Sequence, residues 1–478
     1  MKKIDKITTL GKMMLKDKIT SSWDKLLTEK QQGDLMVFYK KRLEHFWRLP
    51  DLEKIIGKEK AARSYAAMEE VDVLFEDKGI KPLPPPLGQN AFKKLLREAS
   101  SSRPIAAYIH IPFCAKRCLY CDFFSNTDMK FKEPYIDAAI REMELRQEYI
   151  GGEPLDTIYF GGGTPSQLQQ ADFERIFEAA DRLFGTSSCT EITLEANPDD
   201  MTPEYVASLR NLPFNRISMG VQSFKEKDLR FLNRRHDREQ ALRAVGLCKE
   251  NGIQNISIDL IYGLPGQTLE EWQENLDDAI RLEIPHISAY HLIYEEGTAL
   301  YKLMEAGKVT PIEEDLSVTL FSTLINRLTE AGYLHYEISN FGRPGYFSRH
   351  NSSYWTGTKY IGIGPSAHSY DGESRQWNIS SLPRYLQGIK AGIPDIEIEE
   401  LDINTKYNDF IITGLRTMWG IRTADIRERF GEEKQTYLEQ QAATYLRQGL
   451  LIRENDTLTL SKKGIFISDG IMSDLLWV

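Results

Sequence analysis

Three of the five cysteines lie close together, in a stretch that reads YIHIPFCAKRCLYCDFF over residues 108–124. Cys114, Cys118 and Cys121 follow a Cx3Cx2C spacing. Three thiolates can ligate three irons of a [4Fe–4S] cluster and leave the fourth iron open to a substrate or cofactor. The alternative is a structural zinc site with His110 as a further ligand, although closed zinc sites usually pair their cysteines as CxxC units. The spacing favours the cluster and leaves zinc open.

Glycines and carboxylates recur at later points where apolar runs end. Gly161-Gly162-Gly163-Thr164-Pro165 follows one run, and glycines without a Cβ let the backbone approach a ligand closely, although a structural turn would use the same residues. Glu195 ends another run and could accept both hydroxyls of a ribose. Asp259 stands within an apolar run, where an unpaired carboxylate would be costly. It therefore needs a partner such as a ligand or Arg234.

These residues must be positioned by a regular alternation of β-type runs and amphipathic helical patterns. Such an alternation predicts a parallel sheet with right-handed crossovers, in which ligands gather at the carboxyl ends of the strands. The expected strands are Ile105–Ile111, Thr157–Phe160, Glu191–Glu195, Arg216–Val221, Ile256–Tyr262 and His286–His291. The expected helices are 133–149, 169–183, 203–210, 238–251 and 268–281.

The C-terminal third carries a second group of chemically capable residues. Residues 349–355 contain the pattern HNxxYW, with His350, Tyr354 and Trp355, and His368 follows after a glycine-rich stretch. An imidazole beside aromatic rings suits a haem or another tetrapyrrole, which needs an axial ligand and flat apolar contacts. A hydrogen-bonded core histidine beside packed aromatic rings is the alternative. His350 is the first candidate for haem and His368 the second.

Length and charge bound the organisation of the chain. At 478 residues it predicts two or three domains. The net charge of −10 argues against general nucleic-acid binding. Residues 1–64 hold 16 Lys and Arg against 9 Asp and Glu, a balance of +7, so the remainder carries −17. A basic helical extension over 1–100, ending in the Pro-rich linker at 82–86, is therefore expected to precede an acidic body.

The basic extension has two readings. Ile4, Ile7, Leu10 and Met14 recur at roughly helical spacing among lysines. Such a helix could lie on an anionic membrane surface, or it could dock on the body and expose its lysines. The isolated cysteines, the lack of a long apolar run and the lack of a signal-peptide core predict a cytoplasmic protein, with a peripheral position at the inner membrane face as one option.

Taken together, the motif YIHIPFC with Cx3Cx2C, the following GGGTP and the HNxxYW element resemble the radical S-adenosylmethionine (SAM) proteins of the coproporphyrinogen dehydrogenase and HemW group. The resemblance covers about residues 104–478. It implies an α/β fold: a partial (β/α)6 TIM barrel over 104–300, a segment with HNxxYW over 301–400 and a winged-helix-like α+β domain over 401–478. That last domain agrees with helical patterns at 407–418, 423–430 and 433–447 before a small hairpin.

The resemblance also implies cofactors and their residues. The cluster would be held by the three cysteines, and SAM would chelate its open iron. SAM-contacting positions of the group are matched by Tyr108, Tyr120, Gly162, Gly163, Thr164, Glu195, Gln222, Arg234 and Asp259. Some of these serve a second SAM molecule in the group, and one or two SAM molecules both remain open.

The expected function is that of a HemW-like haem chaperone that binds the cluster, SAM and haem and passes haem to acceptor proteins. In the dehydrogenases a further cysteine follows the third cluster ligand as CxC, whereas here Asp122 and Phe123 follow Cys121. The alternative is a radical SAM enzyme acting on a porphyrin, by coproporphyrinogen III decarboxylation or by haem methylation and ring opening. It would need an electron donor for SAM cleavage.

Overall fold

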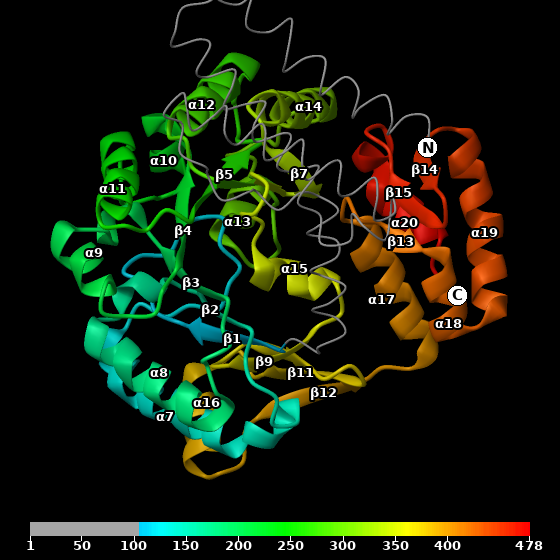
Figure 1. Ribbon diagram of the computed structural model, residues 1–478. Coiled ribbons are helices and arrows are strands. Elements are labelled where there is room, and N and C mark those ends of the chain that lie inside the picture. The colour runs from blue at the N-terminus through cyan, green and yellow to red at the C-terminus, as the bar shows by residue number, and fades with distance from the viewer. Residues whose placement is uncertain (1–104) are drawn as a thin grey trace, which may run out of the picture. The chain divides into compact units, whose positions relative to one another are not determined.

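The computed structural model describes residues 105–478, and a single mixed sheet forms the centre of this part of the chain (Figure 1). The strand order in the sheet is β12-β11-β10-β9-β1-β2-β3-β4-β5-β6-β8-β7. Its middle consists of parallel strands, which confirms the predicted α/β class. They are β1 Ile105–Ile111, β2 Thr157–Gly162, β3 Glu191–Ala196, β4 Arg216–Gln222, β5 Ile256–Tyr262 and β6 His286–His291. All six predicted strands are present, and β2, β3 and β4 run one or two residues further than expected.

The helices that connect these strands also follow the prediction closely. They are α7 Lys132–Leu145, α8 Gln170–Phe184, α9 Pro203–Leu209, α11 Arg238–Glu250 and α12 Leu269–Arg281. The helix expected over 133–149 ends early, and its last residues form the 3-10 helix η3 Gln147–Ile150. Helix α10 Glu226–Phe231 was not predicted, because six residues are too few to show a helical period. Further 3-10 turns are η2 Met129–Phe131, η4 Pro165–Gln167 and η5 Pro198–Asp200.

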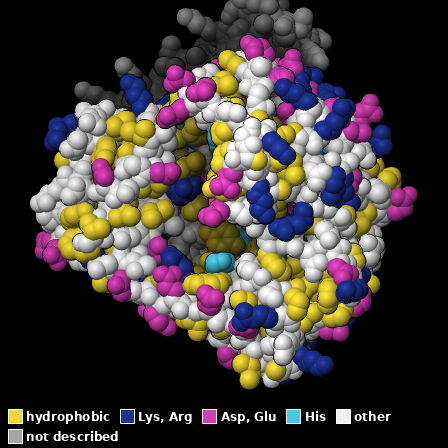
Figure 2. All heavy atoms as spheres, turned by 180° about the vertical axis from the view of Figure 1, so that it is seen from behind, with side chains coloured by type: hydrophobic (Ala, Val, Ile, Leu, Met, Phe, Trp, Pro, Cys, Tyr) yellow, Lys and Arg dark blue, Asp and Glu magenta, His cyan; other side chains and the backbone are white. Residues whose placement is uncertain are grey.

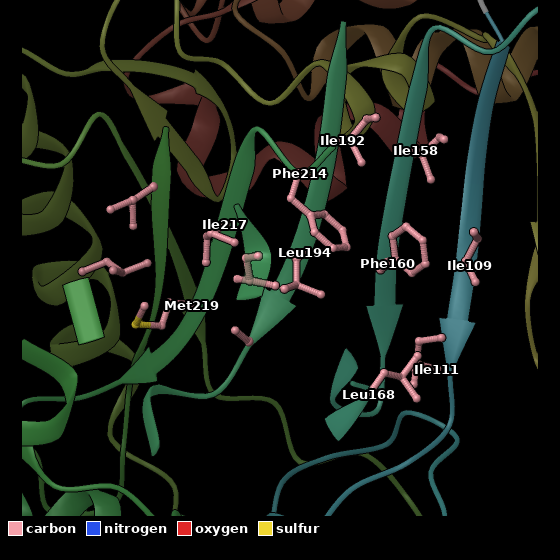
Figure 3. Packing of buried hydrophobic residues seen from close by; sticks show 14 of the residues in the cluster. Ile109, Ile111, Ile158, Phe160, Leu168, Ile192, Leu194, Phe214, Ile217 and Met219 are labelled. Atoms are coloured by element: carbon pink, nitrogen blue, oxygen red, sulfur yellow. The ribbon is translucent and has the colours of Figure 1, made fainter. Parts of the chain in front are cut away.

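Alternation along the parallel strands separates an apolar face from a polar one. Ile109, Ile158, Phe160 and Leu194 lie on one face and are fully or almost fully buried in the main core (Figure 3). Phe160 makes edge contacts with Phe173, Phe177 and Phe214 at centroid distances of 5.2–5.4 Å. Because successive side chains point to opposite faces of a strand, the residues in between point into the barrel. They are mostly polar, and they supply the site described below.

Residues 299–400 extend the sheet at both of its edges, which the sequence did not predict. Strand β9 Lys359–Ile363 pairs in parallel with β1, and β8 Asn340–Gly342 pairs antiparallel with β6. The other elements of this segment are α13 Ala299–Glu305, α14 Glu314–Glu330, β7 Leu334–Glu337, α15 Arg349–Trp355, β10 His368–Tyr370, β11 Ser374–Asn378, α16 Leu382–Lys390 and β12 Ile396–Glu400. The segment that contains HNxxYW is thus continuous with the barrel sheet.

The C-terminal residues form a smaller unit with a hydrophobic core of its own, which includes Tyr407, Ile426 and Leu458. Its helices α17 Ile403–Leu415, α18 Thr423–Phe430 and α19 Glu432–Arg447 correspond to the three expected ones. The expected hairpin is β14 Leu451–Glu454 with β15 Thr457–Leu460. Strand β13 Ile421–Arg422, the 3-10 helix η6 Gly464–Ile467 and helix α20 Ser468–Asp474 complete the unit and were not predicted.

The predictions for the N-terminal extension, its basic helix, its Pro-rich linker and the boundary near residue 100 lie outside the described residues. Within residues 105–478, no helix has both the length and the apolar character needed to cross a membrane.

Candidate functional site

The three cysteines lie on one loop that leaves the carboxyl end of β1. The loop folds back on itself through the Cys114 N–H, which donates to the Asn126 carbonyl at 3.0 Å. It is tied to later elements by the Leu119 N–H, which donates to the Leu232 carbonyl at 3.3 Å, and by Asn233 Nδ2, which donates to the Arg117 carbonyl at 2.8 Å. None of the three cysteines forms a disulfide. Across residues 105–478, no group of three or more His, Cys, Asp or Glu side chains is arranged to hold a single metal ion.

The loop faces a cavity of about 420 Å³, a size within the usual range for cofactor sites. Eleven of the twelve residues predicted for cluster and SAM contribute to its lining, and only Tyr108 does not. These eleven are Cys114, Cys118, Tyr120, Cys121, Gly162, Gly163, Thr164, Glu195, Gln222, Arg234 and Asp259. A hollow is visible near the centre of the face seen from behind, with hydrophobic, acidic and basic side chains around it (Figure 2).

Two side chains donate to the cysteine sulfurs. Thr164 Oγ1 lies 3.3 Å from Cys114 Sγ, and Arg234 Nη1 lies 3.3 Å from Cys118 Sγ. Burial nevertheless raises the pKa of Cys114, and it raises that of Cys121 to about 11. The thiols of Cys114 and Cys121 therefore keep their protons until a metal displaces them, which is the usual coupling of metal binding to proton release.

His110 is not placed as a cluster or zinc ligand. Its Nε2 lies 2.9 Å from the Phe124 carbonyl and its Nδ1 lies 3.3 Å from the Tyr108 hydroxyl, so both ring nitrogens are engaged. Burial lowers its pKa to about 4. The ring fills the space under Gly162, where a Cβ would come within 2.4 Å of His110 Nδ1. The glycine is therefore required for packing against His110, since its φ of +106° and this close contact both exclude larger residues.

Two carboxyl groups form the deep wall of the cavity. Glu195 Oε1 accepts a hydrogen bond from the Tyr159 hydroxyl at 2.7 Å, and Oε2 accepts one from the Gly162 N–H at 3.2 Å. Asp259 is hydrogen-bonded to the hydroxyls of Ser288 and Ser218. The serines thus serve as partners of Asp259, for which the sequence suggested a ligand or Arg234, and the positive charges of Arg216 and Arg234 also act on this carboxyl group.

Burial raises the pKa of both acids, to about 7 for Glu195 and about 6 for Asp259. For Glu195, the negative charge of Asp259 adds to this effect, whereas the bonds from Tyr159 and Gly162 oppose it. Both acids therefore ionise at a higher pH than exposed carboxylic acids do. A cationic ligand would favour the ionised forms of both acids.

Arg234 joins the cysteine loop to the ends of β3 and β4. Besides Cys118, its guanidinium donates to Asn197 Oδ1 at 2.6 Å and to the carbonyl of Gly220. A Cβ at Gly220 would lie 2.9 Å from Gln222 Nε2 and 3.3 Å from Arg234 Nη2. Gln222 itself has a φ of +67° next to an irregularity in the pairing of β4 with β5. The local backbone therefore turns the Gln222 side chain into the cavity.

The site also contains residues that the sequence analysis did not single out. They are Tyr159, Asn197, Ser218, Ser288 and Tyr290. Alternation would have indicated several of them, because Ser218 lies two residues after Arg216 and two before Gly220, and Ser288 lies two before Tyr290 on β6.

The HNxxYW residues lie near the other end of the strands and do not line the cavity. His350 is 1 % exposed, and its Nδ1 lies 2.9 Å from the Oγ1 of Thr157, the first residue of β2. Its Nε2 lies 2.8 Å from the Tyr354 hydroxyl. Trp355 packs under the guanidinium of Arg416 at 5.3 Å. This arrangement is the hydrogen-bonded core histidine that the sequence left open as the alternative to a haem ligand.

His368, the second candidate for haem, is exposed and stacks on Trp377 at a centroid distance of 5.7 Å. It lies on β10, beyond β9 in the sheet order. The structure therefore does not bring His368 to the cavity lining.

A parallel barrel sheet whose first strand leads into a three-cysteine loop, with a glycine turn and carboxylates facing the same cavity, defines the class of radical SAM proteins. Comparisons with known proteins agree: a family model described as "Radical SAM superfamily" matches residues 108–279, and one described as "HemN C-terminal domain" matches residues 401–467. The chain belongs to the HemW family within this superfamily.

The relatives support this assignment over most of the chain. "Heme chaperone HemW" of Lactococcus lactis is 33% identical over 376 residues, which cover 78% of this chain and 98% of the relative. The protein of the same name from Synechocystis is 41% identical over 337 residues, covering 68% of this chain and 80% of the relative. The solved structure of coproporphyrinogen III oxidase (HemN) from Escherichia coli has a TM-score of 0.69 and 24% identity, covering 81% of this chain and 93% of that one, which shows the shared fold.

Membership of the radical SAM superfamily implies a [4Fe–4S] cluster and SAM. The donor set of the cavity fits both groups. It combines three thiols on one loop with carboxyl, amide and guanidinium groups on the facing strands.

Proposed function

We propose that this chain is a haem chaperone that holds a [4Fe–4S] cluster, SAM and haem in and around one cavity, and that delivers the haem to acceptor proteins. The relatives named "Heme chaperone HemW" support this proposal. The structural observation that carries it is the composition of the cavity. Thiols and carboxyl groups line its interior, and large apolar side chains are exposed among the lining residues.

In this proposal Cys114, Cys118 and Cys121 ligate three irons, and Thr164 and Arg234 act on the ligands from outside. Their hydrogen bonds to sulfur stabilise thiolate charge, as outer partners of metal ligands generally do. The cluster, once bound, would supply an open iron for SAM and one electron at a time. Zinc at these cysteines is the rival assignment.

SAM would occupy the space between the cysteine loop and the two carboxyl groups. Glu195 presents acceptor oxygens suited to the ribose hydroxyls, and Asp259, Gln222 and Arg234 surround the remaining volume. Two carboxyl groups with raised pKa values also suit a cationic sulfonium ligand, since a positive charge would ionise them.

Haem would lie among the exposed lining residues of the cavity. Phe123 and Ile293 are each 62 % exposed and Tyr290 is 42 % exposed, although all three contribute to the lining. Flat apolar contacts of this kind suit a macrocycle. Lys116 and Arg117 line the same cavity and have no ion-pair partner among residues 105–478, so they are free to pair with the haem propionates. Asp122 and Glu295 also line the cavity, and their negative charges would repel the propionates.

The sequence pattern predicted His350, Tyr354 and Trp355 as haem-binding residues instead. In the described conformation both nitrogens of the His350 ring are engaged, so iron would reach the ring only if α15 moved away from β2. We therefore place haem at the cavity. Further proposed partners are the haem acceptors, an electron donor if SAM is cleaved, and a membrane surface for the basic extension of a cytoplasmic protein.

The proposal is tested by anaerobic reconstitution followed by haem titration. We expect a brown protein with about four irons per chain, whereas zinc without iron would refute the cluster.

The variants Phe123→Ser and Ile293→Ser should bind haem about tenfold more weakly, because each loses an apolar contact with the macrocycle. Ile393→Ser is the matched control, since Ile393 is 74 % exposed and does not line the cavity. Equal haem affinity in all three variants would contradict haem binding at the cavity.

A porphyrin-converting enzyme is the second candidate, favoured by one observation. The exposed apolar residues and the proposed SAM residues line the same cavity, so a bound tetrapyrrole would lie beside SAM. The two candidates share every binding step and differ only in whether the tetrapyrrole is changed.

A further inference from the structure

Helix α15 contacts the cofactor cavity indirectly, through a stack of rings inside the barrel. The His350 imidazole lies against the Tyr159 ring at a centroid distance of 4.9 Å and an interplanar angle of 25°. Tyr159 in turn lies against Tyr108 at 6.2 Å and 24°. The three rings therefore form a continuous layer within the barrel, below the residues that line the cavity.

Tyr159, the middle ring of this layer, is hydrogen-bonded to Glu195, which lines the cavity. The Tyr159 hydroxyl donates to Glu195 Oε1 at 2.7 Å, and the remaining oxygen of Glu195 accepts from the Gly162 N–H. A Cβ at Gly161 would lie 2.9 Å from both Tyr108 Cε2 and Tyr159 Cε1, and 3.2 Å from Glu195 Cδ. The missing side chain at Gly161 of β2 thus provides room for the Tyr159 phenol and the Glu195 carboxyl group. The phenol fixes one of the two oxygens of Glu195.

His350 is itself held from three directions. Thr157 and Tyr354 contact its two ring nitrogens. Its own backbone N–H donates to Glu191 Oε1 at 2.9 Å, and the Arg349 N–H donates to Oε2 at 2.9 Å. Glu191 is the first residue of β3, so the first turn of α15 is fastened to the strand that carries Glu195. Burial, together with the charge of Arg216, lowers the pKa of His350 to about 3 and keeps the ring neutral.

We propose that His350 is a positioning residue for SAM: its imidazole stacks on Tyr159, fixes the phenol that holds Glu195, and so orients the carboxylate that receives the ribose of the cofactor. The inference rests on the proposed SAM site, and it assigns the histidine of HNxxYW to SAM rather than to haem. Loss of the stack allows the whole Tyr159 side chain to shift, which moves its hydroxyl away from Glu195, and the carboxylate then loses a fixed orientation.

The test measures SAM binding by equilibrium dialysis, together with haem binding, on reconstituted full-length protein. We expect His350→Ala to weaken SAM at least tenfold and to leave haem affinity and its absorption spectrum unchanged. Tyr159→Phe should weaken SAM to a similar degree. The double variant should be little worse than either single variant, since both act on the same carboxylate. If the double variant lost SAM affinity by the product of the two single losses, the proposal would be overturned. Unchanged SAM affinity in His350→Ala would overturn it as well.

A second ligand separates positioning from general damage. If Glu195 receives the ribose, wild-type protein should prefer SAM to its 2′-deoxy analogue by about tenfold, as expected for the loss of a hydrogen bond to a charged group. That ratio should fall towards one in His350→Ala. A general loss of stability would lower both affinities and leave the ratio unchanged, which would contradict the positioning role.

The matched control is His286→Ala. His286 is also a fully buried histidine with both ring nitrogens engaged, by Ser257 and by Tyr336, each at 2.7 Å. It does not contact Tyr159 or Glu195, so its loss should leave SAM affinity unchanged at a comparable cost in stability.

His350→Phe is the second variant if His350→Ala fails to fold. It keeps a ring against Tyr159 and should retain much of the SAM affinity. Wild-type protein that binds no SAM would refute the proposed function, whereas binding that is insensitive to His350 would refute this inference alone.

Discussion

Glu195 and Asp259 show how burial sets the charge of a cavity before any ligand is present. Their pKa values of about 7 and about 6 lie above the usual range of carboxylic acids, and burial is the main cause for each. In the native state both acids therefore keep protons that the unfolded chain has already lost at the same pH. The protein tolerates this cost at the position where a cationic ligand would recover it.

Replacing Glu195 by Gln should stabilise the cofactor-free protein as pH rises. The folded pKa of Glu195 is raised, so the wild-type protein is destabilised progressively between the unfolded value near 4.5 and the folded value near 7. Glutamine does not titrate, so the advantage of the variant should grow across that window by roughly 3 kcal/mol and then stay constant. The measurement is the melting temperature of both proteins from pH 5 to 8. A difference that shrinks as pH rises would contradict the raised pKa.

The Gly220→Ala variant should fold but bind SAM less tightly. The added Cβ would meet the mobile ends of Gln222 and Arg234, so Arg234 would move away from Cys118 and Asn197. The loss of hydrogen bonds to charged groups predicts roughly tenfold weaker binding in equilibrium dialysis.

Gly246→Ala is the control for this substitution. No heavy atom lies within 4 Å of a Cβ at Gly246, which is inside helix α11, so alanine should stabilise the helix by about 0.5–1 kcal/mol without affecting SAM. Equal SAM affinity in Gly220→Ala and Gly246→Ala would show that Arg234 is not held as described.

Among single residues, the sequence predicted those that can be recognised from their type and position alone, without knowledge of their contacts. The three cysteines, the glycine turn, Glu195 and Asp259 stand out by type and position, and the structure brings them to one cavity. Tyr159 and Ser288 were missed because a tyrosine or serine in a strand becomes meaningful only through its partner across the barrel. For His350, the sequence could not distinguish a free imidazole from one with both nitrogens engaged.

Among the elements, the strands added at the β1 edge depend on one buried ion pair. Glu142 and Arg146 lie on and just after α7, with Arg146 Nη1 2.8 Å from Glu142 Oε1. Arg146 also donates to the Gly362 carbonyl in β9 at 2.8 Å, and Glu142 accepts from the Gly364 N–H at 2.8 Å. The pair therefore fastens β9 to the helix that crosses over β1.

Arg146→Met should destabilise the protein by about 3–5 kcal/mol, because it leaves the Glu142 carboxylate buried and without its counter-ion. Adding Glu142→Gln should restore part of the loss. Arg141→Met on the same helix is the control, since its pair with Glu144 is exposed and should contribute less than about 1 kcal/mol. Melting temperatures of the four proteins decide the matter, and equal losses for Arg141→Met and Arg146→Met would contradict the role of the buried pair.

Element prediction succeeded where the pattern was long and regular. Strands β1, β5 and β6 have the predicted bounds, because apolar runs flanked by amphipathic helices are unambiguous. Strands β7 to β12 were missed, because they are three to five residues long and several carry polar residues on both faces. Their pairing with β1 and β6 involves residues far apart in the sequence, which local periodicity does not reveal.

On the scale of the whole molecule, the described part of the chain carries every residue of the proposed site, and the family model begins at residue 108. We predict that a chain lacking residues 1–80 retains iron and SAM binding equal to those of the full chain, because none of the proposed ligands would be removed. Iron content and equilibrium dialysis on both chains provide the measurement. A truncated protein that takes up no cluster would contradict the separate role of the extension.

The most direct test of the proposed chaperone function concerns the fate of the tetrapyrrole. Reconstituted protein is incubated anaerobically with SAM, dithionite and either haem or coproporphyrinogen III, and the tetrapyrrole and 5′-deoxyadenosine are followed by chromatography. A haem chaperone should leave the haem chemically unchanged and pass it to an added apo-haem protein. Loss of carboxyl groups from coproporphyrinogen III, or a methylated or opened haem, would contradict it and show that the cavity belongs to an enzyme.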